Sequence, residues 1–366
     1  MFNRRLILLS LSVLFVMVFS PLQAAQAPKN VIYLIGDGMG VAQVTLARLT
    51  TGKPLAMDSM PVGGFVKTQS ANAAVTDSGA AGTALATGFK TNNGMISTLP
   101  DGKTVQTILE AAAKTGRAVG IVTTVTITHA TPASFGAHVA ARASQADIAP
   151  QYLDKKIDVI MGGGRQFFIP KSRAGSKRTD ETDLIARARS GGYTYVETAE
   201  ELTAANGNKL LGLFEMDALS ATGRQPPLAR MTKKAISALS RDKDGFFVMI
   251  EGGQIDWRCH ANDAAGTVMH MLDFDAAVGQ ALEYARKNGN TLVIVTADHE
   301  TGGLTLLGSE EGGNEFTPTF STTSHSAVNV PFFAYGPGSE VFGGVMDNTD
   351  IPKKIAKLWG VKGFAE

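Results

Sequence analysis

The sequence predicts an α/β fold, a three-layer sandwich in which helices flank a central, largely parallel sheet. Two features predict it. Short apolar runs rich in β-branched residues end in glycine or a polar residue, a pattern typical of central strands that are covered on both faces. Segments with helical periodicity alternate with these runs, which indicates strand–helix–strand units. The chain has 366 residues and is 44% hydrophobic, which is enough for one large core.

Six apolar runs are the expected strands. In chain order they cover residues 30–40, 117–124, 156–164, 245–253, 290–300 and 329–338. Helical periodicity lies between or after these runs, over residues 101–116, 227–242, 263–289 and 351–360. Residues 165–226 are richer in charged residues, serine and threonine and show weak periodicity. We interpret them as a peripheral segment of a single domain that spans residues 25–366.

The N-terminus has the pattern of a secretory signal peptide. Two adjacent arginines precede an apolar run from Leu6 to Phe19, which is shorter than the roughly 20 residues that a membrane-spanning helix needs. Cleavage near Ala24 is favoured, because a cut after Ala27 would leave Pro28 at the new N-terminus. A twin-arginine signal is the alternative, but the strongly apolar run favours the general secretory route. We predict a signal peptide over residues 1–24 and a periplasmic or secreted protein with no stable membrane anchor after cleavage.

The charge balance gives no reason to expect a nucleic-acid or membrane-surface partner, because 34 Lys and Arg residues face 33 Asp and Glu residues. The single cysteine, Cys259, excludes an intramolecular disulfide. It precedes His260, so metal ligation has to be considered, but a buried structural thiol is the favoured interpretation. The glycine loop GDGMG at 36–40 lacks the spacing of a dinucleotide-binding fingerprint.

Carboxylates and histidines gather at the ends of the expected strands, and the carboxyl ends of parallel strands are where α/β proteins form their sites. The candidates are Asp37, Glu251, Asp256, His260, Asp298, His299 and His325. Asp256 and His260 are four residues apart, so one helical turn would place them on the same face. Such donors suit zinc, and carboxylate and hydroxyl oxygens suit magnesium. Each residue taken alone has a simpler interpretation as a turn former or a surface residue.

The stretch AVTDSGAAGTALATG at 74–88 places Asp77 and Ser78 before a run of small residues. Asp and Ser are preferred helix N-caps, so one interpretation is the cap of a buried helix. The other is a nucleophile, because a serine at a helix N-terminus faces free N–H groups and the positive end of the helix dipole. Both would stabilise an alkoxide and a bound phosphate, and this stretch alone leaves the choice open.

Several motifs together resemble the alkaline phosphatase family: YLIGDGMG, TDSGAAGTALATG, THATPASFGAHVAAR, IEGGQIDWRCH, VTADHETGG and SHSAV followed by VPFFAYGPG. They run in the family's order from about residue 30 to residue 338. The resemblance implies a metal-dependent phosphomonoesterase of the compact bacterial type. It implies a phosphoseryl intermediate, small phosphomonoester substrates, two zinc ions and one magnesium ion per subunit, and a homodimer.

The resemblance also implies a role for each residue that matches a motif. Ser78 is the expected nucleophile, and Arg142 is the expected clamp on two phosphate oxygens. The expected ligands of the first zinc are Asp256, His260 and His325. The expected ligands of the second zinc are Asp37, Asp298 and His299. The expected ligands of the magnesium are Asp37, Thr131 and Glu251.

Two positions depart from some well-studied members, which have Asp at the place of His129 and Lys at the place of Trp257. Other members carry His or Trp there. We expect His129 to approach the third metal through water and Trp257 to shape the substrate pocket, which leaves the identity of the third metal open. His138 is expected to share a helix with Arg142, and both His138 and His270 are expected to be structural.

Two other functions stay open at this point. A metal-dependent phosphodiesterase of the same superfamily usually has a threonine nucleophile and lacks the third metal set. A monoesterase is therefore favoured by Ser78, Thr131, Glu251 and Arg142. A non-catalytic periplasmic metal or phosphate binder would need the metal ligands but not Ser78. A sulfatase is disfavoured, because its signature of Pro and Arg two and four places after the nucleophile is replaced by Ala80 and Gly82.

Overall fold

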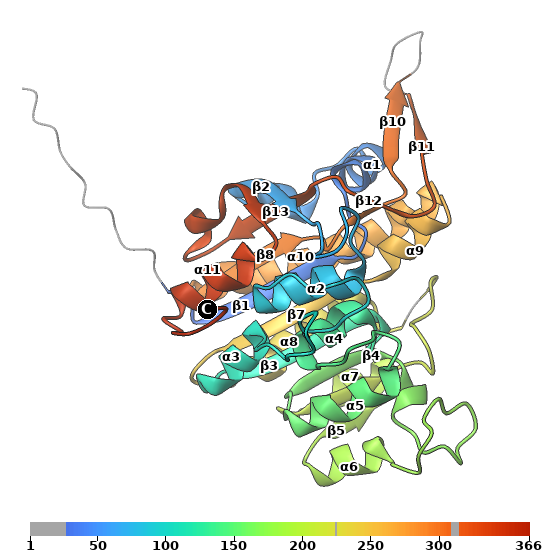
Figure 1. Ribbon diagram of the computed structural model, residues 1–366, viewed down its shortest axis with the longest axis vertical. Coiled ribbons are helices and arrows are strands. Elements are labelled where there is room, and N and C mark those ends of the chain that lie inside the picture. The colour runs from blue at the N-terminus through green and yellow to red at the C-terminus, as the bar shows by residue number, and fades with distance from the viewer. Residues whose placement is uncertain (1–26, 224, 309–314) are drawn as a thin grey trace, which may run out of the picture.

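The computed structural model describes residues 27–223, 225–308 and 315–366, so the predicted signal peptide lies outside the described residues. A ten-stranded sheet forms the centre (Figure 1). In chain order its strands are β1 (Asn30–Gly36), β2 (Val62–Lys67), β3 (Ala118–Thr126), β4 (Val159–Gly163), β5 (Thr194–Val196), β6 (Leu210–Leu213), β7 (Phe246–Gly252), β8 (Thr291–Thr296), β13 (Val330–Tyr335) and β14 (Gly344–Asp347). Across the sheet their order is β14-β2-β13-β8-β1-β7-β3-β4-β6-β5.

The sheet is largely parallel, as predicted. β13 runs antiparallel to both of its neighbours, β2 and β8, whereas the other neighbouring pairs are parallel. In the middle of the sheet, Ile35 of β1 is level with Thr296 of β8 on one side and with Glu251 of β7 on the other. These three strands therefore end at the same edge, and the residues that follow them share one end of the sheet.

Helices cover both faces of the sheet and complete the predicted three-layer sandwich (Figure 1). One layer contains α1 (Val41–Thr51), α8 (Leu228–Leu239) and α10 (Ala264–Asn288). The other layer contains α2 (Ser78–Thr87), α3 (Ile108–Lys114), α4 (Ala130–Gly136) and α11 (Asp350–Leu358). Consecutive residues of β7 face the two layers, as the alternation of a strand requires. The Phe246 ring lies 5.8 Å from Tyr284 of α10, and the Phe247 ring lies 6.1 Å from Phe135 of α4.

The remaining α-helices lie towards the ends of the sheet and include both α-helices of the segment 165–226. They are α5 (Gln145–Asp154), α6 (Leu184–Ser190), α7 (Ala199–Ala204) and α9 (Gln254–His260). None of the helices in the described ranges is long and apolar enough to cross a lipid bilayer.

Two helix expectations were wrong. The helix expected over 101–116 begins only at Ile108, because Thr107 caps it: its hydroxyl accepts from the Glu110 N–H at 3.1 Å, and the Glu110 carboxylate accepts from the Thr107 N–H at 2.9 Å. His138 and Arg142 do not share a helix, because α4 ends at Gly136 and both residues lie in the irregular segment that follows.

The sequence pattern missed the strands at the two edges of the sheet. β2 and β14 form one edge, and β5 and β6 form the other. The residues of β2 are mostly half-buried or exposed, and β5 has only three residues, so neither presents a continuous apolar run. The segment 165–226 thus contributes two strands to the central sheet, which is more regular structure than its weak periodicity indicates.

Two small antiparallel sheets stand beyond the carboxyl edge of the central sheet. One joins β10 (Leu304–Gly308) to β11 (Phe316–Phe320), and the other joins β9 (Glu300–Thr301) to β12 (His325–Ser326). In the second sheet His325 pairs with Thr301. This short pairing returns a residue from late in the chain to the end of β8.

Candidate active site

The site lies where β1, β7 and β8 end. Asp37 directly follows β1, Glu251 is the penultimate residue of β7, and Asp298 and His299 follow β8 after one intervening residue. All four side chains are buried. His299 Nε2 lies 3.4 Å from Asp37 Oδ1 and 3.2 Å from Asp298 Oδ2. The predicted gathering of these residues at one edge is therefore confirmed.

Ser78 is the first residue of α2, so the cap and the nucleophile interpretations of the Asp–Ser pair are compatible. Asp77 is the N-cap, and its Oδ1 accepts a hydrogen bond from the Ala80 N–H at 2.9 Å. The buried Ser78 Oγ lies 3.2 Å from His299 Nε2. The positive end of the α2 dipole therefore faces the cluster of acidic and imidazole groups.

The small residues of α2 have a packing reason. Every residue of this helix is buried, and it packs against α4. A Cβ added at Gly82 would lie 2.8 Å from Ser134 Oγ and 3.4 Å from the Thr131 Cα, both on α4. Close contact between the two helices thus requires glycine here, and it fixes Ser78 relative to Thr131.

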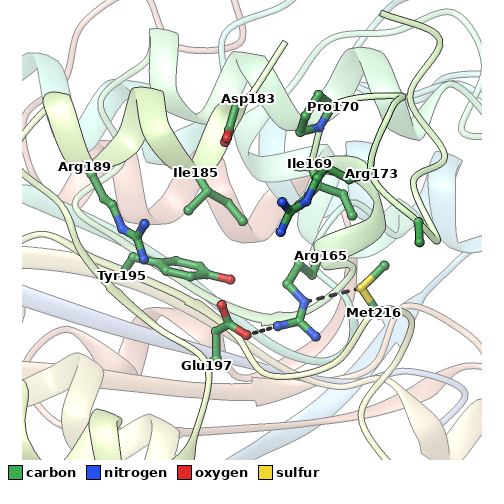
Figure 2. Close-up of a pocket in the computed structure, with 11 residues that line it drawn as sticks. Arg165, Ile169, Pro170, Arg173, Asp183, Ile185, Arg189, Tyr195, Glu197 and Met216 are labelled. Atoms are coloured by element: carbon green, nitrogen blue, oxygen red, sulfur yellow. Dashed lines mark hydrogen bonds and ion pairs between the residues drawn. The ribbon is translucent and has the colours of Figure 1, made fainter. Parts of the chain in front are cut away.

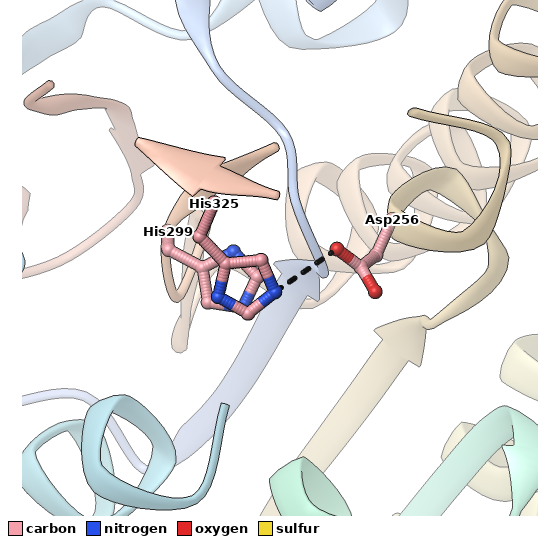
Figure 3. A group of neighbouring side chains, drawn as sticks. All are labelled: Asp256, His299 and His325. Carbon is pink, nitrogen blue, oxygen red and sulfur yellow. Dashed lines mark ion pairs between the residues drawn. The ribbon is translucent and has the colours of Figure 1, made fainter. Parts of the chain in front are cut away.

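A first ligand group forms around α9. Asp256 and His260 lie one turn apart, as predicted, with His260 Nε2 at 3.3 Å from Asp256 Oδ2. His325 Nε2 lies 3.2 Å from His260 Nε2 and 3.6 Å from Asp256 Oδ1. Figure 3 shows Asp256 opposite the stacked rings of His299 and His325, whose centroids are 3.5 Å apart. Asp256, His299 and His325 form one group whose ligand atoms all lie within 4.8 Å of one another, and His260 Nε2 approaches both Asp256 and His325.

Two further ligand groups share Asp37. The second consists of Asp37, Asp298 and His299, as the resemblance implies. The third consists of Asp37, Glu251 and His129, which places His129 beside the expected magnesium ligands. In both groups the ligand atoms lie within 4.8 Å of one another.

Several buried oxygens in these groups have no hydrogen-bond partner among the described residues. They are both carboxylate oxygens of Asp37, Asp298 Oδ2, Glu251 Oε1 and Thr131 Oγ1. Buried acceptors left unpaired are costly. A divalent cation satisfies carboxylate, hydroxyl and imidazole donors together, so the donor sets fit metal ions.

The pKa values of Asp37 and Glu251 are raised, first by burial and then by neighbouring carboxylates. Burial raises the pKa of Asp37 well above its usual value, and the charges of Asp298 and Asp256 raise it further. Burial also raises the pKa of Glu251 to about 7, although a hydrogen bond from Thr123 lowers it. A bound cation would relieve this repulsion and favour the ionised forms.

The pKa values of His260 and His129 shift in opposite directions, because the two side chains have different surroundings. The hydrogen bond to Asp256 raises the pKa of His260 to about 9, against the opposing effect of burial. Burial, followed by the charge of Arg142, lowers the pKa of His129 to about 4. His129 is therefore neutral near pH 7, and its buried Nδ1 has no hydrogen-bond partner among the described residues.

Arg142 is held beside the nucleophile by the same carboxylate that caps α2. Its Nη1 lies 2.9 Å from Asp77 Oδ2, and its Nη2 lies 3.4 Å from His129 Nε2. Trp257, on α9, is 38% exposed, and its ring meets the His129 ring edge-on with centroids 6.2 Å apart. The structure thus brings Arg142, His129 and Trp257 together at the rim of the site.

Two threonines that the sequence analysis does not single out support the ligands. The Thr301 hydroxyl donates to Asp256 Oδ1 at 2.5 Å and lies 3.2 Å from His299 Nδ1, so it links two ligand groups. Thr123 donates to Glu251 Oε2 from the neighbouring strand. A signal for Thr301 exists, because residues two apart in an extended segment point to the same side, and Thr301 follows His299 by two.

The other histidines and the cysteine lie outside the ligand groups. His138 Nε2 lies 2.9 Å from Glu110 Oε1, and its Nδ1 lies 2.9 Å from the Ser97 carbonyl oxygen. His270 is buried in α10. Burial raises the pKa of the Cys259 thiol to about 12, so it stays protonated, and none of the three ligand groups in the described ranges includes it.

Comparison with known proteins gives one consistent result. Residues 28–317 match the family model described as alkaline phosphatase. Alkaline phosphatase 3 of Bacillus subtilis (strain 168) is 35% identical over 90% of this chain and 88% of its own length. Alkaline phosphatase of Escherichia coli (strain K12) is 33% identical over 91% of this chain and 86% of its own length.

Solved structures agree with this result. The alkaline phosphatase from the Antarctic bacterium TAB5 is 38% identical, with a TM-score of 0.85 over 92% of this chain and 100% of that chain. A variant of the TAB5 enzyme, 39% identical with a TM-score of 0.84 over 91% of this chain and 98% of that chain, has Mg bound in its M3 site. The present chain therefore belongs to the alkaline phosphatase family and is a phosphoric monoester hydrolase.

Proposed function

We propose that the protein hydrolyses small phosphate monoesters by way of a phosphoseryl intermediate on Ser78. The position of Ser78 Oγ carries this proposal: it lies at the N-terminus of α2, 3.2 Å from His299 Nε2, and next to Asp77, which holds Arg142. A phosphate bound here would meet the free N–H groups of the helix and a guanidinium at once. Both favour a dianion.

We assign two zinc ions and one magnesium ion to the site. The proposed ligands of the first zinc are Asp256, His260 and His325. The proposed ligands of the second zinc are Asp37, Asp298 and His299. The proposed ligands of the magnesium are Asp37, Thr131 and Glu251. The buried oxygens without hydrogen bonds support the second zinc and the magnesium, and a TAB5 variant in which Asp replaces a His has Mg in its M3 site. When bound, the cations would lower the pKa of the serine hydroxyl and stabilise charge on the leaving oxygen.

The proposed reaction has two displacements at phosphorus. Ser78 Oγ attacks the phosphorus atom, the ester P–O bond breaks, and the leaving alcohol takes up a proton. Water then attacks the phosphoserine, which releases inorganic phosphate and returns the serine hydroxyl. Arg142 holds two non-bridging oxygens with its planar fork in both steps, and Asp77 keeps that fork oriented.

His129 and Trp257 are proposed to line the substrate side of the site. The neutral imidazole of His129 has an unpaired Nδ1 in the group with Asp37 and Glu251, so it is available to the third ion. Its Nε2 faces Arg142, so the same ring connects the third ion to the phosphate clamp. Trp257 packs against this ring and is partly exposed, which suits contact with the organic part of a substrate.

The test compares a chromogenic phosphomonoester with a matched diester. Arg142→Ala should lower kcat/KM for the monoester by about 10- to 100-fold, as expected for the loss of charge-assisted hydrogen bonds. The weak activity on the diester should fall much less, because an ester group replaces one of the oxygens that the fork would bind. Arg187→Ala, which removes an exposed arginine paired with Asp154, is the control. Equal losses on both substrates would contradict the proposed clamp.

We also propose that export removes residues 1–24 and leaves a single catalytic domain over residues 25–366, with residues 165–226 at its periphery. The support is the basic and apolar pattern at the N-terminus. The mature protein would be periplasmic or secreted and would have no stable membrane anchor or nucleic-acid partner. Intact-mass analysis of the periplasmic and medium fractions tests the cleavage, and a mature chain that still begins at Met1 would contradict it.

A homodimer is proposed through an apolar face beside the site. Exposed Val41 of α1, Phe65 of β2 and Val345 of β14 line one groove of about 550 Å³. Large apolar side chains gathered on one face are typical of an interface. Val345→Asp should produce monomers in analytical ultracentrifugation, whereas Val328→Asp, at an exposed residue outside the groove, should not. A wild-type protein that sediments as a monomer would overturn this proposal.

A further inference from the structure

A polar pocket lies at the carboxyl edge of the sheet (Figure 2), and Ser78 is not among the residues that line it. It has a volume of about 450 Å³ and is built by the segment 165–226. Arg165 follows the end of β4 after one residue, Glu197 directly follows β5, and Met216 follows β6. These strands are parallel to β7 and lie two to four strands from it, which is roughly 10–20 Å at the usual strand spacing. The carboxyl ends of strands in such sheets are the usual place for ligand sites.

The charged groups of this pocket leave a positive surplus. Three arginines and two carboxylates line it: Arg165, Arg173, Arg189, Asp183 and Glu197. Arg165 is paired with Glu197. Asp183 caps α6 by accepting from the Ala186 N–H at 2.8 Å. Arg173 forms no ion pair with any residue in the described ranges.

Arg189 and Tyr195 both line the pocket, and the Tyr195 hydroxyl lies at the end of the ring away from the Arg189 guanidinium (Figure 2). The Arg189 guanidinium lies over the Tyr195 ring, with Cζ 4.9 Å from the ring centroid. Stacking of this kind leaves the N–H groups in the guanidinium plane available for an anion. The Tyr195 hydroxyl is buried and no residue in the described ranges accepts a hydrogen bond from it; Arg165, which lies near it, can only donate. Burial raises the pKa of Tyr195, so at neutral pH the hydroxyl keeps its proton and can donate it.

Figure 2 shows the Tyr195 hydroxyl and the guanidinium groups of Arg165 and Arg173 directed into one central space. Ile169 and Ile185 line the pocket on either side of the Arg173 guanidinium, facing Tyr195 and Arg165. The cavity volume of about 450 Å³ falls in the range of sites for small molecules. A buried hydroxyl without an acceptor is unfavourable, and an anionic oxygen in this space would satisfy it.

We propose that this pocket binds a small organic dianion. Its phosphate or dicarboxylate group is held by Arg173, Arg189 and the Tyr195 hydroxyl, and its apolar body lies against Ile169 and Ile185. Arg165 contributes less, because Glu197 already neutralises it. The pocket is separate from the phosphate position at Ser78, so the two sites can be filled independently.

Calorimetric titration of the holoenzyme tests the proposal with two probes, phenylphosphonate and phthalate. Phenylphosphonate has a P–C bond in place of the ester oxygen, so it is not a phosphomonoester substrate. The wild type should bind it at two sites, of which Arg142→Ala weakens the one at Ser78. Arg173→Ala and Arg189→Ala should each weaken the other site by roughly tenfold or more, while kcat/KM for a phosphomonoester stays within about twofold. Binding of phthalate at the second site would show that dicarboxylates also fit.

The matched control is Arg187→Ala, on the same helix as Arg189 but outside the pocket and paired with Asp154. It should titrate as the wild type does. If the Arg173 and Arg189 variants also titrate as the wild type does, or if neither probe finds a second site, the proposal is overturned.

A change at Tyr195 separates ligand binding from a structural role. Tyr195→Phe removes a hydroxyl that donates to no residue in the described ranges, so the thermal stability of the ligand-free protein should not fall. The same variant should bind the probe more weakly at the second site. Lower stability with unchanged probe affinity would mean that the hydroxyl serves the fold, and would overturn its assignment to the ligand.

Discussion

The two carboxylate oxygens of Asp77 have different roles: one caps α2 and the other holds Arg142. The substitution Asp77→Asn should remove the second role and keep the first. Oδ1 caps α2 through the Ala80 N–H at 2.9 Å, and Oδ2 holds Arg142 Nη1 at 2.9 Å. Asparagine is as good an N-cap as aspartate, so its side-chain oxygen can keep the cap. Its amide has no charge to hold the guanidinium. The expected result is a stable helix with a loosened phosphate clamp.

The size of the effect follows from the exposure of the pair. The Arg142 and Asp77 side chains are 30% and 20% exposed, so solvent screens the ion pair and its contribution is about 1 kcal/mol at most. If all of it orients Arg142 for phosphate, the affinity for phosphate falls by about fivefold. Competitive inhibition by inorganic phosphate measures this affinity. We expect KM to rise by a similar factor and kcat to fall less, because weaker phosphate binding also eases product release.

Two further variants make the test decisive. Asp77→Ala removes the cap as well, which costs about 1 kcal/mol, so the Tm should fall for alanine and not for asparagine. Asp263→Asn is the matched control, because Asp263 also caps a helix through the Gly266 N–H at 2.9 Å and lies 3.5 Å from Arg258, but outside the ligand groups. The reasoning is refuted if Asp77→Asn keeps the wild-type phosphate affinity, or if asparagine and alanine lose the same thermal stability.

The remaining predictions concern the nucleophile, the metals and one acidic group remote from the site. Ser78→Ala should abolish turnover, and acid-quenched wild-type enzyme should carry phosphate on the peptide containing residues 74–88; phosphate on another peptide would disprove the assignment. Chelation should abolish hydrolysis and lower the Tm, because the buried carboxylates around Asp37 then repel one another. Zinc with magnesium should restore both, and full activity in protein shown to be metal-free by elemental analysis would disprove the requirement. Burial raises the pKa of Glu110, but hydrogen bonds from His138 and Lys155 outweigh it and lower that pKa to about 2. The stability that Glu110 contributes is therefore present above its unfolded value of 4.5 and lost as the pH falls towards 2. Glu110→Gln should unfold in less urea than the wild type near neutral pH, and a gap that stays constant down to about pH 3 would contradict this.

Much of the catalytic centre can be predicted from short stretches of the sequence. The central strands are continuous apolar runs, because both of their faces are covered. These runs predict six strands: β1, β3, β4, β7, β8 and β13. Asp37, Glu251 and Asp298 all follow or end such runs, so the sequence places them at one edge of a parallel sheet; they meet because β8, β1 and β7 are neighbours in the sheet. The spacing of Asp256 and His260 needs only one helical turn to place them side by side. These features are predictable because each depends on a few neighbouring residues.

Contacts between distant segments were decided by the tertiary structure. Arg142 meets Asp77 across 65 residues, and no local pattern places it there, since it lies in an irregular segment and not on the expected helix. The edge strands β2, β5, β6 and β14 are short or half-exposed, so pairing with a neighbour, and not an apolar run of their own, makes them strands.

The site at Ser78 and the pocket of the segment 165–226 differ in how far the sequence predicts them. The residues at Ser78 stand in motifs that can be read in sequence order, whereas Arg173, Arg189 and Tyr195 are scattered through a segment of weak periodicity. These residues come together because β6 pairs with β4 and β5 pairs with β6 at the end of the central sheet. This pairing places α6 and its neighbouring loop next to β5. Local sequence determined the strands, the helical turns and the kind of chemistry at their ends. Only the packing of edge strands, loops and helices decided which side chains meet, because that depends on burial and hydrogen bonding between segments that are far apart in the chain.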